Sequence, residues 1–268
     1  MKVFVVDIAK CNGCYNCQIA CKDEHVDNDW GSYAKPQPDT GQFWMKIHEK
    51  IHGQTPKVKI EYTPTPCMHC DNAPCITEDG AVYKRDDGLV IIDPTKAQNK
   101  KEIVDTCPYN KIYWNEFLQL PQKCTGCAHL LDEGGIPRCV DACATGALQF
   151  GEEEDFADLI AQAEVMQPEL GLSPRVYYLN RFHNFVAGEV FDPIEDECIE
   201  EALVSLTCNK TNQTLETGTD CFGDFWLRKL PSGNYNIKIE KAGYKTYEEK
   251  NIKVEDSIKL EDVPLEKI

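Results

Sequence analysis

The chain has 268 residues, fifteen cysteines and a formal net charge of −17. This length suits one large domain or two ordinary ones, and so acidic a surface argues against nucleic acid or an anionic membrane as a partner. No apolar run approaches the roughly 20 residues that span a bilayer, and no signal peptide is recognisable. We therefore expect a soluble protein of a reducing, anoxic cytoplasm.

Residues 1–150 are predicted to form the first domain. A strand over residues 2–8 leads to Cys11 on a turn that contains Gly13. Residues 22–66 form an insertion without cysteine that is too long for a simple loop, and we expect it to cover a cofactor or dock a partner. A hairpin follows over residues 82–93, with Asp87-Gly88 as its turn.

The rest of the chain divides into a connecting region and a second domain. Acidic residues from Glu152 on are predicted to open a helix that runs to about Val165, within a helix and linker over residues 151–185. From 186 to 268 short runs alternate between apolar and polar residues, as in Tyr235–Ile239, and turns separate them. Regular short strands of this kind predict an antiparallel sandwich.

Twelve of the fifteen cysteines lie in four blocks of recognisable spacing. The blocks are Cys11, Cys14, Cys17 and Cys21; Cys67, Cys70 and Cys75; Cys107 alone before a proline; and Cys124, Cys127, Cys139 and Cys143. Four-iron clusters take four thiolates each, three from one tight run and a fourth from elsewhere in the chain. Twelve thiolates therefore suggest three 4Fe-4S clusters.

Zinc and disulfides are the alternative uses of so many cysteines. Cys-x-x-Cys pairs also bind zinc, but the triple run at residues 11, 14 and 17 is typical of a cluster loop. Disulfides would fit a small secreted chain, which this is not.

The sequence around these blocks resembles the iron–sulfur subunits of molybdopterin oxidoreductases. The resemblance covers about residues 1–150 and is carried by Pro66–Cys75, Asp105–Tyr109 and Lys123–His129. Within the family the chain is most similar to the small subunits of aromatic transhydroxylases. The resemblance implies an α+β fold in which a double ferredoxin-like domain precedes the β-domain. Residues 186–268 themselves resemble immunoglobulin-like, transthyretin-related modules.

Family members exchange the last cysteine of a block with another block. Carried over to this chain, the resemblance implies three ligand sets. They are Cys11, Cys14, Cys17 and Cys143; Cys67, Cys70, Cys75 and Cys107; and Cys124, Cys127, Cys139 and Cys21.

A fourth cluster, common in the family, has lost all its ligands here. Family spacing places Ala97, Lys100 and Ile103 where three ligands would be, and residues 76–81 offer no fourth. The family arrangement implies that the lost cluster is third of four in a row leading away from molybdenum. Its loss is therefore expected to interrupt electron relay.

Several other residues have either a role at a cluster or a purely structural role. His69 and His129 lie inside cysteine loops, where hydrogen bonding or packing is favoured over ligation. Lys10, Lys22 and Lys123 flank cysteines and either tune cluster potentials or lie on the surface. Outside the blocks, Cys198, Cys208 and Cys221 are expected to be free, partly buried thiols.

The sequence thus predicts an electron-transfer subunit without catalytic residues of its own. Its implied partner is a large subunit that carries molybdenum on two pterin guanine dinucleotides and acts on hydroxylated aromatics. One alternative is the corresponding subunit of a reductive enzyme, such as a catechol dehydroxylase or an arsenate-type reductase. A second is a free carrier that resembles a polyferredoxin.

Overall fold

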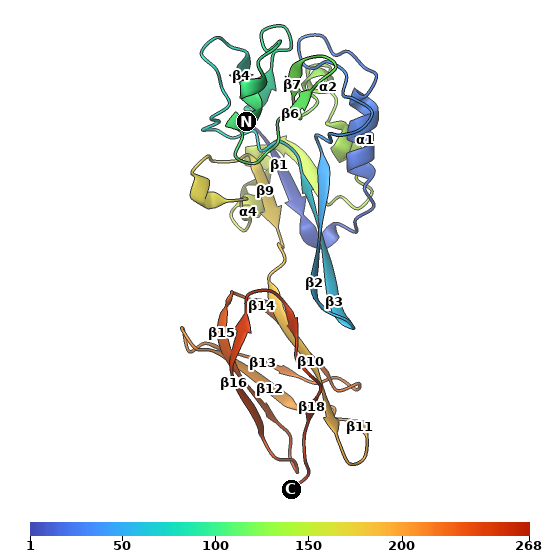
Figure 1. The fold of residues 1–268 in the computed structure, drawn as a ribbon, viewed down its shortest axis with the longest axis vertical. Coiled ribbons are helices and arrows are strands. Elements are labelled where there is room, and N and C mark those ends of the chain that lie inside the picture. Colours follow the sequence, from blue (N-terminus) through green and yellow to red (C-terminus); the bar gives the residue numbers. More distant parts are fainter. The chain divides into compact units, whose positions relative to one another are not determined.

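The computed structural model describes residues 1–268, which divide into two compact units (Figure 1). The first comprises Met1–Glu49 and Tyr62–Arg181, and the second comprises Lys50–Glu61 and Phe182–Ile268. The second unit thus includes residues 50–61, which lie inside the insertion expected over residues 22–66.

The first unit is built on a three-stranded sheet with β1 (Lys2–Asp7) at its centre. β8 (Leu148–Glu152) pairs with β1 in antiparallel fashion, and β9 (Val176–Leu179) pairs with it in parallel. Val3 to Val6 are all buried because both faces of the strand are covered, which explains the unbroken apolar run. The strand predicted over residues 2–8 is confirmed.

Short hairpins and helices carry the cysteine loops of this unit. The predicted hairpin over residues 82–93 is confirmed, with Gly88 at φ 91° in its turn. The elements are β4 (Val82–Lys84), β5 (Val90–Ile92), β6 (Tyr113–Asn115), β7 (Leu120–Gln122), α1 (Asn16–His25), α2 (Ala128–Asp132) and α3 (Arg138–Asp141).

The helix predicted from Glu152 to about Val165 is wrong in its length. A 3₁₀ turn (Glu153–Phe156) leads into α4 (Ala157–Ile160), which is a single short helix. Glu164 then exchanges backbone hydrogen bonds of 2.8 Å with Tyr178 beside β9. The chain leaves the helical path because these extended-chain bonds replace helical ones.

The insertion contains a long hairpin that the sequence did not predict. β2 (Lys46–Gln54) and β3 (Lys57–Thr65) pair with each other, and their far ends belong to the second unit. In that unit Lys57 forms an ion pair with Asp224. Gln54 accepts a hydrogen bond of 2.5 Å from the backbone nitrogen of Lys259.

The second unit is a sandwich of two sheets. Its core is formed by alternate residues of both sheets, including Val186, Leu206, Phe225 and Ile237. The strands are β10 (Asn184–Asp192), β11 (Glu197–Cys198), β14 (Asp224–Leu230), β17 (Ile258–Lys259) and β18 (Val263–Pro264) in one sheet, and β12 (Leu203–Cys208), β13 (Thr214–Gly218), β15 (Gly233–Glu240) and β16 (Tyr247–Val254) in the other.

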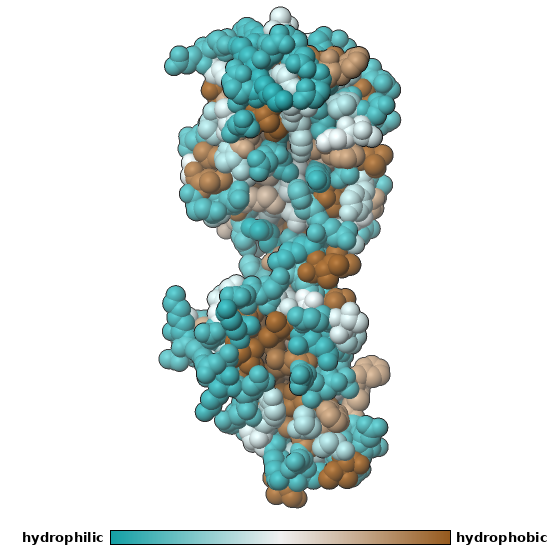
Figure 2. Space-filling view, viewed as in Figure 1, coloured by the Kyte–Doolittle hydropathy of each residue, from teal (hydrophilic) through white to brown (hydrophobic).

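The surface is mostly hydrophilic, with scattered apolar side chains (Figure 2). Phe117, Ile194 and Phe222 are the most exposed internal large apolar residues. Scattered exposure of this kind is normal for a folded chain. None of the helices combines the length and the apolar character needed to cross a membrane.

Candidate metal centres

The twelve cysteines of the four blocks lie in three groups, whose members are close enough for their charges to act on one another. Group A is Cys11, Cys14, Cys17 and Cys143. Group B is Cys67, Cys70, Cys75 and Cys107. Group C is Cys21, Cys124, Cys127 and Cys139. These groups contain the same residues as the three ligand sets implied by the family resemblance, whose role as ligands remains a prediction.

Groups A and C exchange one cysteine each through α1 and α3. Cys17 and Cys21 lie four residues apart in α1, yet Cys17 lies with Cys143 while Cys21 lies with Cys139. Cys139 in turn lies in α3, and Cys143 follows it. The packing of the two helices against each other therefore explains how neighbours in one block serve different groups.

Group A is the most exposed of the three. Cys14 is exposed, Cys11 and Cys143 are partly buried, and only Cys17 is buried. Burial, followed by the nearby thiols of Cys11 and Cys143, raises the pKa of Cys17 to about 12. Gly13 turns the loop at φ 69°, where a β-carbon would come 2.5 Å from the ring of Tyr62.

Group C is fully buried. Burial raises the pKa of Cys21 and of Cys139 well above the usual value of a thiol, and the other cysteines of the group raise both further. The ring nitrogen Nε2 of His25 lies 3.8 Å from Sγ of Cys127. The predicted hydrogen-bonding role of His129 is confirmed, since its Nε2 lies 3.0 Å from Oε1 of Glu24.

Group B surrounds a cavity. All four of its cysteines line one small space, together with His69 and Val90. Burial raises the pKa of Cys70 to about 12 and that of Cys75 to about 11. The positive charge of Lys123 acts in the opposite direction on Cys75.

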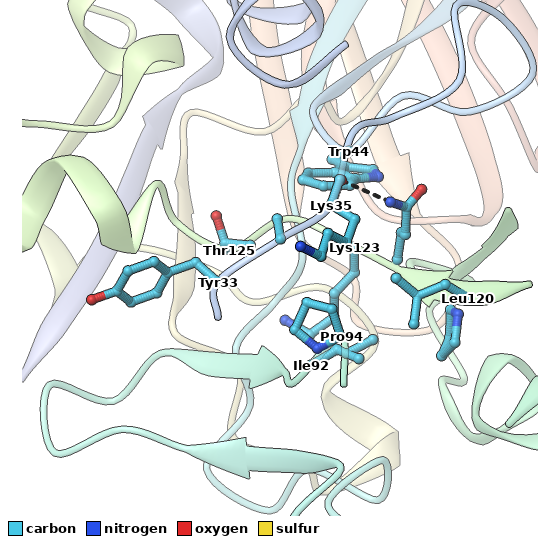
Figure 3. A pocket seen from close by; sticks show the side chains of 11 residues that line it. Tyr33, Lys35, Trp44, Ile92, Pro94, Leu120, Lys123 and Thr125 are labelled. Carbon is cyan, nitrogen blue, oxygen red and sulfur yellow. Dashed lines mark hydrogen bonds between the residues drawn. The ribbon is translucent and has the colours of Figure 1, made fainter. Parts of the chain in front are cut away.

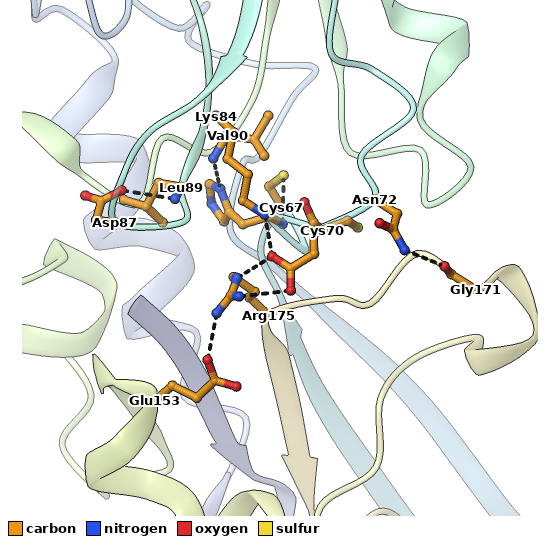
Figure 4. Close-up of polar contacts among 12 residues, drawn as sticks. Cys67, Cys70, Asn72, Lys84, Asp87, Leu89, Val90, Glu153, Gly171 and Arg175 are labelled. Carbon is orange, nitrogen blue, oxygen red and sulfur yellow. Dashed lines mark hydrogen bonds and ion pairs between the residues drawn. The ribbon is translucent and has the colours of Figure 1, made fainter. Parts of the chain in front are cut away.

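The loop of Cys67 and Cys70 is fixed by polar contacts from several segments (Figure 4). Arg175 donates two hydrogen bonds to Asp71, of 2.7 and 2.9 Å, and a third of 3.0 Å to Glu153. Lys84 pairs with the same aspartate. The strand β9 and the hairpin β4–β5 therefore both hold the loop in place.

The chemistry of the three groups fits iron–sulfur clusters. No three Cys, His, Asp or Glu side chains of residues 1–268 are arranged to hold a single metal ion. Buried thiols that repel one another's charge remain protonated unless a cation compensates them, and a bound metal deprotonates a coordinating thiol outright. Within group B all four cysteines face one common space, and the buried Nε2 of His69 has no partner in the chain.

The groups follow one another in the order A, C, B. Cys17 of group A is close enough to Cys21 of group C to raise its pKa, and Cys67 of group B is close enough to Cys124 of group C to do the same. Ala97 and Ile103 of the lost fourth site instead pack in one apolar cluster with Cys75 of group B. The prediction that the lost cluster was third in the row is therefore wrong, because its site lies next to group B at the end of the row. Its loss shortens the row of clusters and does not interrupt it between two groups.

The lost fourth site is filled by protein. Ala97 is fully buried and Ile103 is 2% exposed. Lys100 forms an ion pair with Asp79, which follows Cys75 at the same spacing as Cys21 follows Cys17. Apolar packing and an ion pair thus occupy the positions where four thiolates would stand.

A second small cavity lies near group C (Figure 3). It is lined by Trp44, Ile92, Leu120 and Lys123 among others. The Nζ atom of Lys123 is already engaged with the carbonyl oxygens of Val90 and Cys124. No ligand can be assigned to this cavity.

Other candidates from the sequence behave in different ways. Cys198, Cys208 and Cys221 are free, as predicted, but Cys198 and Cys221 are exposed, not partly buried. Lys10 lies on the surface, whereas Lys123 is 3% exposed. Sequence reasoning missed Lys111, a buried lysine that donates to Thr65 Oγ1 at 2.7 Å, because no spacing pattern marks it.

Known proteins share both parts of the chain. Residues 58–153 match the 4Fe-4S dicluster domain, and residues 186–263 match the carboxypeptidase regulatory-like domain. The small subunit of pyrogallol hydroxytransferase from Pelobacter acidigallici is 40% identical, with 96% of each chain covered.

More distant relatives match about two thirds of this chain. One of these, a tetrathionate reductase component from Salmonella typhimurium, is 30% identical over 68% of this chain and 73% of its own length. The iron–sulfur subunit ArrB of the arsenate respiratory reductase from a Shewanella species is also 30% identical. That match covers 66% of this chain and 95% of the relative. With its cysteine blocks and these relatives, the chain belongs to the family of iron–sulfur subunits of molybdopterin oxidoreductases.

Proposed function

We propose that this chain is the electron-transfer small subunit of a molybdenum enzyme that acts on hydroxylated aromatics, similar to pyrogallol–phloroglucinol transhydroxylase. The observation that carries the proposal is the 40% identity to a pyrogallol hydroxytransferase small subunit, which extends over 96% of both chains. That match includes the C-terminal sandwich, whereas the reductase subunits match about two thirds of this chain.

The chain would hold three 4Fe-4S clusters, one in each cysteine group. Group A would hold the first, group C the second and group B the third. When bound, each cluster would take up and release one electron at a time. The surrounding residues exclude water from groups B and C, because six of their eight cysteines are less than 8% exposed in the chain.

The catalytic site would lie outside this chain. A large partner subunit would carry molybdenum on two pterin guanine dinucleotides and bind the substrate, and this subunit would contribute no catalytic residue. A reducing cytoplasm is the proposed location, because solvent-accessible cysteines such as Cys14, Cys198 and Cys221 remain thiols there.

The order of the cysteine groups suits a reaction without net electron flow. A respiratory reductase needs an outer cluster that receives electrons from a membrane donor. Here the position beyond group B is filled by Ala97, Ile103 and the Lys100–Asp79 pair. A transhydroxylase moves a hydroxyl group between aromatics with no net redox change, so it tolerates a row that ends at group B.

The C-terminal unit would serve as a docking or stabilising module of the immunoglobulin-like or transthyretin-like kind. Its two sheets enclose a continuous apolar core, and its residues 186–263 match a regulatory-like domain. It would bind protein, not a reacting substrate.

One alternative function rests on a specific observation. The 30% identity to tetrathionate and arsenate reductase subunits favours, as second candidate, the same role in a reductive enzyme. A free carrier is the third candidate, and the family membership argues against it.

Affinity purification of the chain from its native cells, followed by metal analysis, tests the proposal. We expect a large molybdenum-containing subunit to co-purify; a chain that purifies alone would contradict the proposal. The complex is then assayed on trihydroxybenzenes with and without a reductant. Turnover without reductant supports a transhydroxylase, and turnover that requires reductant supports the reductive alternative.

A further inference from the structure

Three cysteine loops share one unusual backbone conformation. The residue before the second cysteine has a positive φ in each: Gly13 at 69°, Gly126 at 63° and His69 at 45°. Glycine adopts this left-handed conformation without steric cost, but a residue with a β-carbon does not. Group B therefore retains a histidine where the equivalent loops of groups A and C use glycine.

The hydrogen bonds of His69 define its protonation state. The backbone nitrogen of Val90 donates to Nδ1 at 3.0 Å, a contact drawn in Figure 4. A nitrogen that accepts a hydrogen bond carries no proton, so the proton of the neutral ring lies on Nε2. His69 is 1% exposed, and Nε2 has no partner in residues 1–268.

A buried N–H donor without an acceptor is costly, so its surroundings are informative. His69 lines the small cavity of group B together with all four of its cysteines. The acceptors that this cavity would offer, once loaded, are the sulfur atoms of a cluster. Hydrogen bonds to cluster sulfurs are one of the means by which a protein sets a reduction potential.

Lys123 adds a positive charge behind Val90, which lines the same cavity. Its side chain is buried, and Nζ donates to the carbonyl oxygens of Val90 and Cys124 instead of to a carboxylate. Val90 thus joins the two side chains, because its N–H binds His69 and its C=O binds Lys123. The charge of Lys123 acts to lower the pKa of the Cys75 and Cys107 thiols, which means that it favours negative charge at these positions.

We propose that the His69–Val90–Lys123 network raises the reduction potential of the cluster held by group B. The inference rests on the proposed function, because it requires that cluster. Reduction adds one electron, and hence one negative charge, to the cluster. An N–H donor and a positive charge without a counter-ion both stabilise the reduced form more than the oxidised form.

Group C also has an imidazole and charged groups beside it. Nε2 of His25 lies 3.8 Å from Sγ of Cys127, and the charge of Lys123 acts to lower the pKa of Cys124 as it does that of Cys75. Glu24, a carboxylate that is 9% exposed, acts to raise the pKa of Cys127, and Arg138, which pairs with it at 2.8 Å, acts to lower it. His69→Gly is therefore the variant that is specific for group B, because His69 lines the space between the cysteines of that group alone.

Potentiometric titration of the full chain in its complex, followed by electron paramagnetic resonance, tests the network with His69→Gly and Lys123→Met. Glycine is the residue of the two equivalent loops, so the first variant retains the loop conformation. We expect both variants to lower the midpoint of the same cluster. The expected change is at least tenfold in its one-electron reduction equilibrium, about 59 mV.

Lys10→Met is the matched control. Lys10 precedes Cys11 as Lys123 precedes Cys124, but it is exposed and lies 3.7 Å from the carboxylate of Asp7. We expect it to leave all three midpoints unchanged. A shift as large as that of Lys123→Met would overturn the inference, because any lysine beside a cysteine would then have the effect.

Iron content separates failure of the inference from failure of the proposed function. A wild-type chain with clearly fewer than about twelve iron atoms would overturn the three-cluster proposal, and the inference with it. Full iron content with unmoved midpoints in His69→Gly would overturn the inference alone. If Lys123→Met fails to retain iron, His69→Gly alone decides the test.

Discussion

Lys100 forms an ion pair with Asp79, and both residues stand where ligands of a fourth cluster would be expected. Lys100 follows Ala97 and precedes Ile103 at ligand spacing, and Asp79 follows Cys75 by four residues. The two charges neutralise each other at the edge of an apolar cluster that contains Ala97, Ile103 and Cys75. The site has therefore been closed by packing and charge pairing, and the local backbone is retained.

Restoring four cysteines should restore a cluster at this position. We expect the variant Asp79→Cys, Ala97→Cys, Lys100→Cys, Ile103→Cys to bind about sixteen iron atoms per chain instead of about twelve, because the ligand spacing is still present. Iron analysis and spin quantification after reduction measure the gain. The triple variant that retains Asp79 is the control and should gain less. A folded quadruple variant with an unchanged iron content would show that the backbone no longer fits a cluster.

The exchange of cysteines between groups A and C makes a prediction about pairs of variants. Cys21→Ser should alter the same cluster signal as Cys127→Ser, although Cys21 lies in the first block. Cys143→Ser should alter the same signal as Cys17→Ser, because Cys143 lies with group A. Electron paramagnetic resonance of the four single variants measures this. Signals that pair by block, Cys21 with Cys17, would contradict the exchange.

The spacing of the cysteines predicted the local triplets, and the family resemblance predicted which distant cysteine joins each triplet. The order of the groups was not accessible from the same pattern. It depends on the proximity of Cys67 and Cys124, a tertiary contact between segments far apart in the chain. The family arrangement therefore gave the wrong place for the lost site.

Secondary structure failed where tertiary contacts override local preference. The acidic segment after Glu152 has helical character, but the bridge between Glu164 and Tyr178 ends that helix early. The hairpin β2–β3 was missed because Glu49 interrupts the apolar alternation between Ile47 and Ile51. The longer strands of the sandwich were found because their inward residues alternate regularly. The short strands β17 and β18 were missed, and they pair with β10 in parallel, so the sandwich is not purely antiparallel as predicted.

Asp132 joins three segments of the first unit and should contribute a stability that is constant near neutral pH. Arg85 donates to its two oxygens at 2.6 and 3.0 Å, and Tyr33 donates at 2.5 Å. The hydrogen bonds from Arg85, and then from Tyr33, lower the pKa of Asp132 to about 2. A carboxylate whose pKa is lowered by folding stabilises the fold at every pH above its pKa in the unfolded chain, which is near 4. This stabilisation is lost as the pH falls toward the folded pKa of about 2.

Asp132→Asn should therefore lower the melting temperature by the same amount at pH 5, 6 and 8. The expected loss is at most about 1 kcal/mol, because the carboxylate is 41% exposed and solvent screens the pair. This corresponds to about 2–4 °C. Asp27→Asn, at an exposed position, is the control and should have no effect. A difference that changes between pH 5 and 8 would show that another group titrates with the pair.

Gly53 should be the residue of the β2–β3 hairpin least tolerant of a side chain. It has a φ of 83°, and a β-carbon there would lie 2.3 Å from the carbonyl oxygen of Lys57 and 2.5 Å from Cζ of Phe185. We expect Gly53→Ala to cost about 1–3 kcal/mol, because a left-handed alanine is strained and the backbone oxygen cannot move aside cheaply. Gly218→Ala, where a β-carbon meets nothing within 4 Å, should change stability by less than about 0.5 kcal/mol. Calorimetry of thermal unfolding measures both variants. Equal melting temperatures would contradict the packing of the hairpin end in the second unit, since only Gly53 lies against Lys57 and Phe185.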